Sequence, residues 1–168
     1  MNGKVGLVFI LFLLIAVACK VNYSMSGASI APDVKTILIK YFTKTASLGP
    51  ATLSQEFTER LKEKFLTQTN LTLTNGSADL IMEGTISSYT ITPQAIQVNE
   101  TAARNRLSIT VSVKFTNLKD EKQNFESSFT RFSEYSSQQN ISEVEEALVT
   151  DIITQLVDDI FNKSVINW

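Results

Sequence analysis

Three basic residues in the middle of the chain are the side chains whose type and spacing best suit binding chemistry. Arg104 and Arg106 are two residues apart, so on a strand both point to the same side. A guanidinium group matches a phosphate through two parallel hydrogen bonds, so the pair suits an anionic lipid headgroup. Lys114, in the same basic stretch, is a third candidate for ligand or partner binding. The alternative is that the two arginines are solvated ends of a strand.

The chain offers few groups for catalysis. It has no histidine and a single cysteine, Cys19, which removes the usual general base and the histidine-dependent nucleophile pairs. The sequence contains no glycine-rich phosphate loop and no acidic calcium loop. We therefore expect no enzyme activity, no cofactor and no metal site. A lipid-anchored enzyme with a carboxylate pair stays open as an alternative, because residues far apart in sequence can meet in the fold.

The segment before Cys19 predicts export. Residues 1–18 contain one basic residue, Lys4, then an apolar run over 5–15 and small residues at the end, which is typical of a secretory signal peptide. The run is too short for a membrane span, which needs about 20 apolar residues. With a cysteine at the junction it resembles a bacterial lipoprotein signal, although Ala16 stands where Leu is usual. That resemblance implies cleavage before Cys19 and a lipid attached to it; the alternative is a plain secretory signal with a chance cysteine.

The distribution of charge limits the partners. The formal net charge is −2, whereas a nucleic-acid-binding domain normally presents a strongly basic face, so we expect no nucleic acid. Residues 101–131 carry a net charge of +3 and residues 140–168 a net charge of −5. Such asymmetry can orient a protein toward an anionic partner, and the alternative is two differently solvated faces.

Hydrophobic periodicity predicts a single domain over residues 35–168, with four strands and two helices. Residues 19–34 lack periodicity and predict a flexible tether between the lipid and this domain. The predicted strands are Thr36–Phe42, Asp79–Ile91, Leu107–Phe115 and Phe125–Phe132, and Leu71–Gly76 is predicted as a turn. Apolar residues recur every four positions over Leu53–Phe65 and Val144–Ile160, so both segments predict helices, opened by capping boxes at Thr52–Gln55 and Ser142–Glu145.

The order strand, helix, three strands, helix predicts an α+β fold with a four-stranded, mainly antiparallel sheet. The three later strands are joined by short links, so they are expected to be antiparallel neighbours. Each helix has one apolar face, so both helices are expected to pack on the same side of the sheet. The other side is expected to stay open; it carries Ser108, Thr110, Ser112 and Lys114.

The connection between the second and third strands is longer than a hairpin needs. It runs over Thr92–Arg106, and loops of this length in a compact domain are often functional. The alternative is that its ends prolong the two strands. Pro93 is predicted to end the second strand, and Gly84 within that strand predicts a bulge or a close backbone approach.

Several segments together resemble the LptE family of LPS-assembly lipoproteins, in the form found in Bacteroidetes. The similarity is carried by Cys19–Gly27, Asp79–Tyr89, Asn105–Phe115 and Asp159–Trp168. It covers nearly all of the chain after Cys19 and contains no catalytic signature. The resemblance implies a two-helix, four-strand lipoprotein at the inner leaflet of the outer membrane, anchored in the membrane through its lipid.

The same resemblance implies the partners. They are an LptD-like outer-membrane β-barrel, whose lumen the protein plugs and whose assembly it assists, and lipopolysaccharide, which it helps to pass to the cell surface. Of the residues, only acylated Cys19 and the basic strand ends carry over from the family. The alternative function, from a different class, is a surface-exposed lipoprotein that binds glycan or a host protein through the open face of its sheet.

Overall fold

The computed structural model describes residues 30–94 and 103–165. Its strands are β1 (Thr36–Ile39), β2 (Thr43–Lys44), β3 (Thr72–Leu73), β4 (Leu80–Gln94), β5 (Arg104–Asn117) and β6 (Phe125–Ser136). Its helices are α2 (Leu53–Gln68), α3 (Ile141–Val165) and the short 3-10 turn η1 (Glu121–Gln123). Cys19, the signal and most of the predicted tether lie outside the described residues, so lipidation and the domain boundaries stay predictions.

The six strands form one mixed sheet. Their order is β3-β1-β4-β5-β6, with β2 also paired to β4. The pairs β1–β3, β1–β4 and β2–β4 are parallel, whereas β4–β5 and β5–β6 are antiparallel. The expected α+β class and the antiparallel order of the three long strands are confirmed, but the expectation of four mainly antiparallel strands is wrong. β1 joins β4 through the helical crossover α2, a connection that allows parallel pairing.

Two details of the first half explain the additional strands. The segment predicted as one strand over Thr36–Phe42 breaks at Lys40, whose backbone N–H donates to the Met82 carbonyl before β2 begins. The segment predicted as a turn over Leu71–Gly76 contains β3, which continues the sheet beyond β1. Strands of two residues leave no periodicity to read, because alternation needs about four residues.

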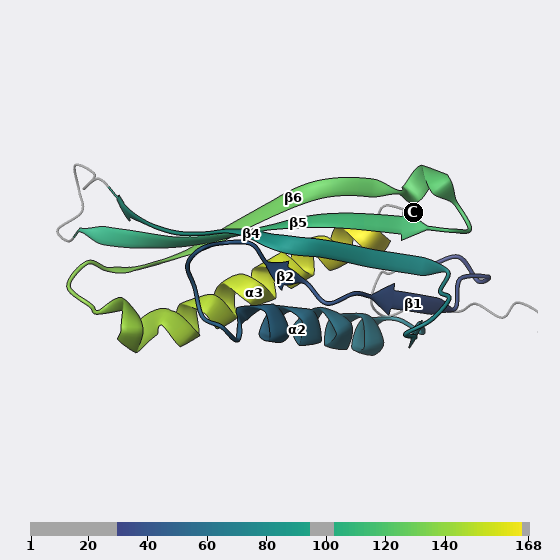
Figure 1. Ribbon diagram of the computed structural model, residues 1–168, viewed down its shortest axis with the longest axis horizontal. Coiled ribbons are helices and arrows are strands. Elements are labelled where there is room, and N and C mark those ends of the chain that lie inside the picture. Colours follow the sequence, from purple (N-terminus) through teal and green to yellow (C-terminus); the bar gives the residue numbers. More distant parts are fainter. Residues whose placement is uncertain (1–29, 95–102, 166–168) are drawn as a thin grey trace, which may run out of the picture.

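Both long helices pack on one face of the sheet, as Figure 1 shows. The α2 stripe Leu53, Phe57, Leu61 and Phe65 is buried. On α3 the residues Leu148, Ile152, Leu156 and Ile160 are buried, and Phe65 meets Phe161 at a ring-centroid distance of 5.1 Å. The predicted helical stripes and the shared face are therefore confirmed.

The helix starts differ from the sequence prediction. Thr52 has a helical backbone and makes no side-chain capping bond, so the capping box predicted there is wrong. Ser142 lies inside α3, and its backbone N–H donates to Oδ1 of Asn140 at 3.2 Å. Asn140 therefore caps the helix, in keeping with the strong preference for Asn at this position.

The two central strands are longer than predicted. β4 continues through Pro93 to Gln94, and Thr92–Gln94 pairs with Arg104–Arg106. Proline is tolerated there because its missing N–H faces away from β5, where β4 has no described neighbour. The two ends of the long connection therefore prolong the strands, which was the alternative stated for this segment. Its middle, residues 95–102, lies outside the described residues.

Gly84 lies where β5 and Phe42 of the β1–β2 link come close to β4. A Cβ atom there would lie 2.1 Å from the Ser112 carbonyl oxygen and 2.5 Å from Cε1 of Phe42. The predicted close backbone approach is confirmed. The bulge of β4 lies further on, between Ile86 and Ser88.

Asp79 ties the start of the domain to the sheet. Its carboxylate accepts hydrogen bonds from the backbone N–H groups of Lys35 and Thr36 at 2.9 and 3.0 Å, and from the Thr36 hydroxyl at 2.9 Å. Nζ of Lys119 lies 3.4 Å away. The Lys35 bond, followed by the Thr36 hydroxyl, lowers the pKa of Asp79 from 3.8 to about 2. The Asp79 carboxylate therefore stays charged at pH values at which carboxyl groups with ordinary pKa values begin to be protonated.

Candidate functional site

The face of the sheet opposite the helices is the candidate site, and we call it the open face. It consists of alternate side chains of β4, β5 and β6, because successive residues of a strand point to opposite sides. Along β5 the residues of this face alternate with the buried Leu107, Ile109, Val111 and Val113. The open face predicted from the alternation in this strand is therefore confirmed.

The basic end of the open face is built by Arg104 and Arg106 with a partner that the sequence did not reveal. Both arginines lie on the same side of β5, and Glu134 lies opposite Arg106 on β6. Nε and Nη2 of Arg106 donate to Oε1 of Glu134 at 3.0 and 2.6 Å. The nearest approach of Arg104 to this carboxylate is 3.9 Å, from Nη1 to Oε2. Only the register of β5 against β6 brings Glu134 to the pair.

The two arginines are held differently. The Arg106 guanidinium lies 4.0 Å from the ring centroid of Phe132, whose side chain is 46% exposed, so it is fixed by an ion pair and by an aromatic ring. The Arg104 side chain is 52% exposed, and its contact with Glu134 is longer than a hydrogen bond. Arg104 is therefore the better placed of the two to donate to an anion from solution.

Hydroxyl groups cover the middle of the open face. They come from Thr85, Ser88 and Thr90 of β4, Ser108, Thr110 and Ser112 of β5, and Ser128 and Thr130 of β6. Two cross-strand pairs bond directly, Thr110 with Thr130 at 2.9 Å and Ser112 with Ser128 at 3.1 Å. Hydroxyl groups on three neighbouring strands can both donate and accept hydrogen bonds, which suits a hydroxylated or phosphorylated ligand.

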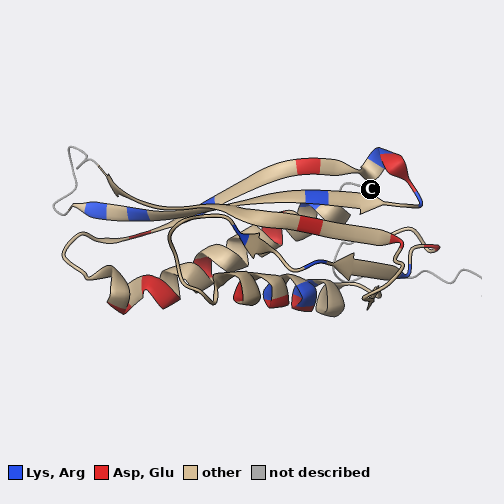
Figure 2. Ribbon diagram, viewed as in Figure 1, with Lys and Arg blue, Asp and Glu red and all other residues tan. Residues whose placement is uncertain are grey.

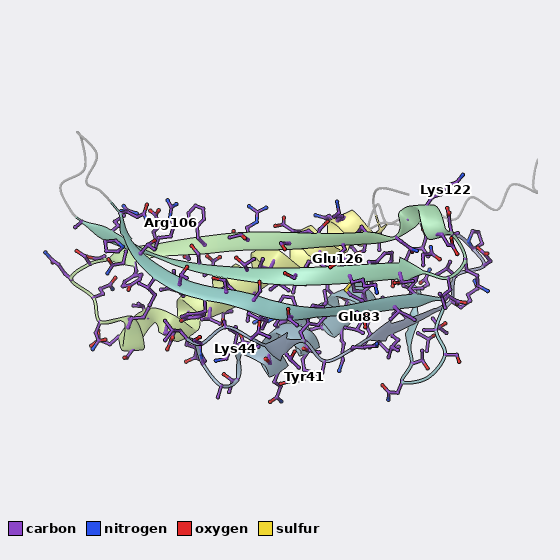
Figure 3. All side chains as sticks on the ribbon, turned by 45° about the horizontal axis from the view of Figure 1, so that its top comes forward. Tyr41, Lys44, Glu83, Arg106, Lys122 and Glu126 are labelled. Carbon is purple, nitrogen blue, oxygen red and sulfur yellow. The ribbon has the colours of Figure 1, made fainter. Side chains whose placement is uncertain are left out.

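The far end of the open face has charges of both signs, and Lys114 lies there. Glu83 accepts from Nζ of Lys40 at 2.6 Å and lies 3.6 Å from Nζ of Lys114, and Glu126 is opposite Lys114 in the register. The Lys40 hydrogen bond, with help from Lys114, lowers the pKa of Glu83. Figure 3 shows Arg106 at one end of the sheet and Glu83 with Glu126 toward the other.

The three basic candidates do not form one site. Arg106 and Lys114 are separated by eight residues along β5, or about 27 Å at about 3.4 Å per residue. One lipid headgroup cannot touch both. The structure therefore brings Arg104 and Arg106 together, as their spacing predicted, and places Lys114 in a separate cluster of mixed charge.

A pocket of about 430 Å³ lies beside the basic end. Val144, Ala147 and Leu148 of α3 give it an apolar side, and Arg104 and Glu134 also line it. The apolar side is positioned by a contact between the layers, in which the Tyr89 hydroxyl donates to Oε1 of Glu145 at 2.5 Å. Burial, followed by this hydrogen bond to Glu145, raises the pKa of Tyr89. Tyr135, which also lines the pocket, was not singled out by the sequence because its strand was predicted to end at Phe132.

Opposite charges from the two layers lie at the same end of the molecule. In Figure 2 the start of β5 is basic, and the first turns of α3 are acidic. Over residues 30–94 and 103–165, no group of three or more His, Cys, Asp or Glu side chains is arranged to hold a metal ion. Within the same residues no helix is long and apolar enough to cross a membrane.

Comparisons with known proteins agree with this architecture. A minor lipoprotein from Acinetobacter baumannii has a similar structure, with a TM-score of 0.52 and 16% identity, covering 77% of this chain and 91% of that one. The rare lipoprotein B from Shewanella oneidensis gives a TM-score of 0.52 and 13% identity, covering 76% and 92%. At these identities the likeness shows the fold alone. No curated protein matches the sequence.

The family model for lipopolysaccharide assembly, LptE, matches residues 34–164. This range includes every helix and strand of the described domain except the last residue of α3. It also includes both arginines of the basic end and all the hydroxyl residues of the open face. The chain therefore belongs to the LptE family of lipopolysaccharide-assembly proteins.

Proposed function

We propose that this protein is a lipid-anchored outer-membrane lipoprotein that plugs and helps to assemble an LptD-like β-barrel and assists lipopolysaccharide transport. Membership of the LptE family is the observation that carries the proposal. Cys19 holds the lipid anchor at the inner leaflet of the outer membrane, and the domain faces the periplasm and enters the barrel lumen. The role is one of binding and assembly, without catalysis.

The shape of the domain supports insertion into a barrel. β4 has 15 residues, which span about 50 Å at about 3.4 Å per residue. The hydrocarbon core of a bilayer is about 30 Å thick. An elongated body of two layers, seen in Figure 1, is long enough to reach through such a barrel along its axis.

The basic end supports contact with lipopolysaccharide phosphates. In the proposed complex Arg104 donates two parallel N–H groups to one phosphate, as guanidinium groups do with such anions. Arg106, fixed by Glu134 and Phe132, adds positive potential without leaving its partners. The hydroxyls of the open face lie next to this end and can bond the sugars that carry the phosphates. Lys114 contacts the wall of the barrel lumen in this arrangement, since it lies too far along β5 to share the phosphate.

Accessibility in intact cells tests the proposal. A plug inside a barrel is protected from protease added outside the cell, and becomes accessible only after the outer membrane is permeabilised. Digestion in intact cells would instead indicate the surface-exposed lipoprotein that binds glycan or a host protein. An anchored protein of known surface location serves as the positive control for the protease.

A further inference from the structure

The last strand of the sheet, β6, has one side without a described neighbour. It pairs with β5 alone, whereas the opposite edge of the sheet is the two-residue strand β3. Figure 1 shows no described element beyond β6. We call this side the β6 edge. An edge strand presents a row of unpaired backbone groups that can pair with another chain.

The phase of the hydrogen bonds fixes which backbone groups point outward. The N–H of Ser137 donates to the carbonyl of Ala103 at 3.1 Å, and these residues continue the β5–β6 register, in which Arg104 faces Ser136. In an antiparallel ladder, bonded and non-bonded pairs alternate, so the odd-numbered residues of β6 bond to β5. The even-numbered residues therefore direct N–H and C=O to the edge; they are Glu126, Ser128, Thr130, Phe132 and Glu134. Ser136 follows them, but its carbonyl accepts from the Gln139 N–H.

The β6 edge lacks most of the devices that usually block an edge strand. It has 12 residues with neither proline nor glycine, and its register with β5 runs without a bulge from Ser136 to Phe125. Natural edges are commonly short, bulged, covered or interrupted by proline. Charge is the one device present, from Glu126, Arg131 and Glu134.

These charges discriminate against a second copy of the same strand. Antiparallel pairing of two β6 edges centred on Thr130 would set Glu126 opposite Glu134 at both ends. The other register with equally long overlap, centred on Arg131, would set that arginine, which is held by Asp159 of α3, opposite its own copy. Like charges directly opposite each other destabilise a strand pair. A strand with a basic residue opposite Glu126 has no such conflict. A second basic residue opposite Glu134 can reach Oε2, since Arg106 donates to Oε1.

We propose that the β6 edge binds one extended segment of another protein, which adds to the sheet as a further strand. Backbone N–H and C=O groups of the even-numbered residues supply the hydrogen bonds. Basic side chains of the added strand face Glu126 and Glu134, and apolar side chains on its other face lie beside Phe129, which is only partly buried. This surface shares Phe132 and Glu134 with the basic end, but its hydrogen bonds come from the backbone of β6 and need neither arginine.

The test uses a capped peptide with the sequence Lys-Val-Thr-Val-Thr-Val-Thr-Val-Lys, which reads alike in both directions. In the free protein, amide exchange followed by NMR is expected to be fast at the even-numbered residues of β6 and slow at the odd-numbered ones. Peptide binding is expected to slow amide exchange at the even-numbered residues between 126 and 134 by at least about tenfold, because backbone hydrogen bonding protects an amide. A peptide with both Lys replaced by Glu is expected to bind at least about tenfold more weakly.

A pair of variants at one position separates backbone pairing from side-chain contact. Thr130→Pro removes an N–H that points outward, so the ladder with β5 is kept, and peptide affinity is expected to fall at least about tenfold. Thr130→Ala keeps that N–H, and affinity is expected to change less than about twofold. Unchanged binding to Thr130→Pro, equal loss in both variants, or no binding of the peptide at millimolar concentration overturns the proposal. Slow exchange at the even-numbered amides of the free monomer, or self-association through β6, overturns it equally, because the edge would then be covered by this chain itself.

Discussion

Truncating Arg104 and Arg106 separately should give two different losses, because the two side chains are held differently. In Arg104→Ala, a half-exposed contact of 3.9 Å is removed, and such surface pairs contribute only about 0–1 kcal/mol. The fold should therefore keep its stability. A bidentate bond to phosphate contributes about 1.5–3 kcal/mol, so the Kd for purified lipopolysaccharide should rise about 10- to 150-fold.

Arg106→Ala should affect stability first. It removes two donors to Glu134, at 3.0 and 2.6 Å, and the contact with the Phe132 ring. Because these contacts are partly exposed to solvent, their loss should lower the free energy of unfolding by about 1–2 kcal/mol. For a domain of this size, that lowers Tm by about 3–6 °C.

Thermal unfolding followed by circular dichroism, and titration with lipopolysaccharide at two salt concentrations, measure both effects. Lys122→Ala is the matched control, because it removes the same charge from η1, at the opposite end of the sheet in Figure 3. If Arg104→Ala binds like the wild type at low salt, Arg104 is only a solvated strand end and does not bind the phosphate. If both arginine variants lose the same stability, the division of roles is wrong.

Four further predictions concern the buried core, the close approach within the sheet, the hydrogen bonds of Asp79 to the start of the domain, and the lipid anchor at Cys19. Ile152→Ala should cost about 2–5 kcal/mol in the free energy of unfolding, measured with urea, because Ile152 is fully buried; an unchanged midpoint would contradict the packing of α3. Gly84→Ala should cost at least about 1–3 kcal/mol, since its Cβ would meet the Ser112 carbonyl oxygen at 2.1 Å, and native-like stability would contradict that close approach. The lowered pKa of Asp79, about 2 against 3.8, should give stability that is complete above pH 3.8 and lost as the pH falls through about 2; Asp79→Asn should lack this step in urea unfolding across that range. Cys19→Ser should abolish fatty-acid labelling and leave the precursor uncut, and normal labelling would exclude Cys19 as the lipid site.

The long elements could be predicted from the sequence because their periodicity extends over many residues. Strict alternation over Leu107–Phe115 identified β5 and its open face, and a four-residue repeat identified both helices. The short parallel strands β2 and β3 could not be predicted, since two residues carry no period and depend on the neighbour that they meet. The prediction that Pro93 ends its strand was wrong, because the sequence does not show whether the proline nitrogen faces a neighbouring strand or the outside of the sheet.

The candidate site was predictable in part for a similar reason. Two arginines spaced for one side of a strand can be read from a single segment. Glu134, Phe132 and Tyr135 complete the basic end and its pocket, but they depend on the register of β6 against β5, which no local pattern reveals. The distance between Lys114 and the arginines follows from the length of β5 alone. The predicted strand was too short to include the arginines.

Affinity purification of the tagged protein from outer membranes, with identification and quantification of co-purifying proteins by mass spectrometry, tests the central proposal most directly. The proposed plug should bring with it one large outer-membrane β-barrel protein in an amount comparable to its own. Recovery of the protein from intact outer membranes without any such barrel would contradict the proposal.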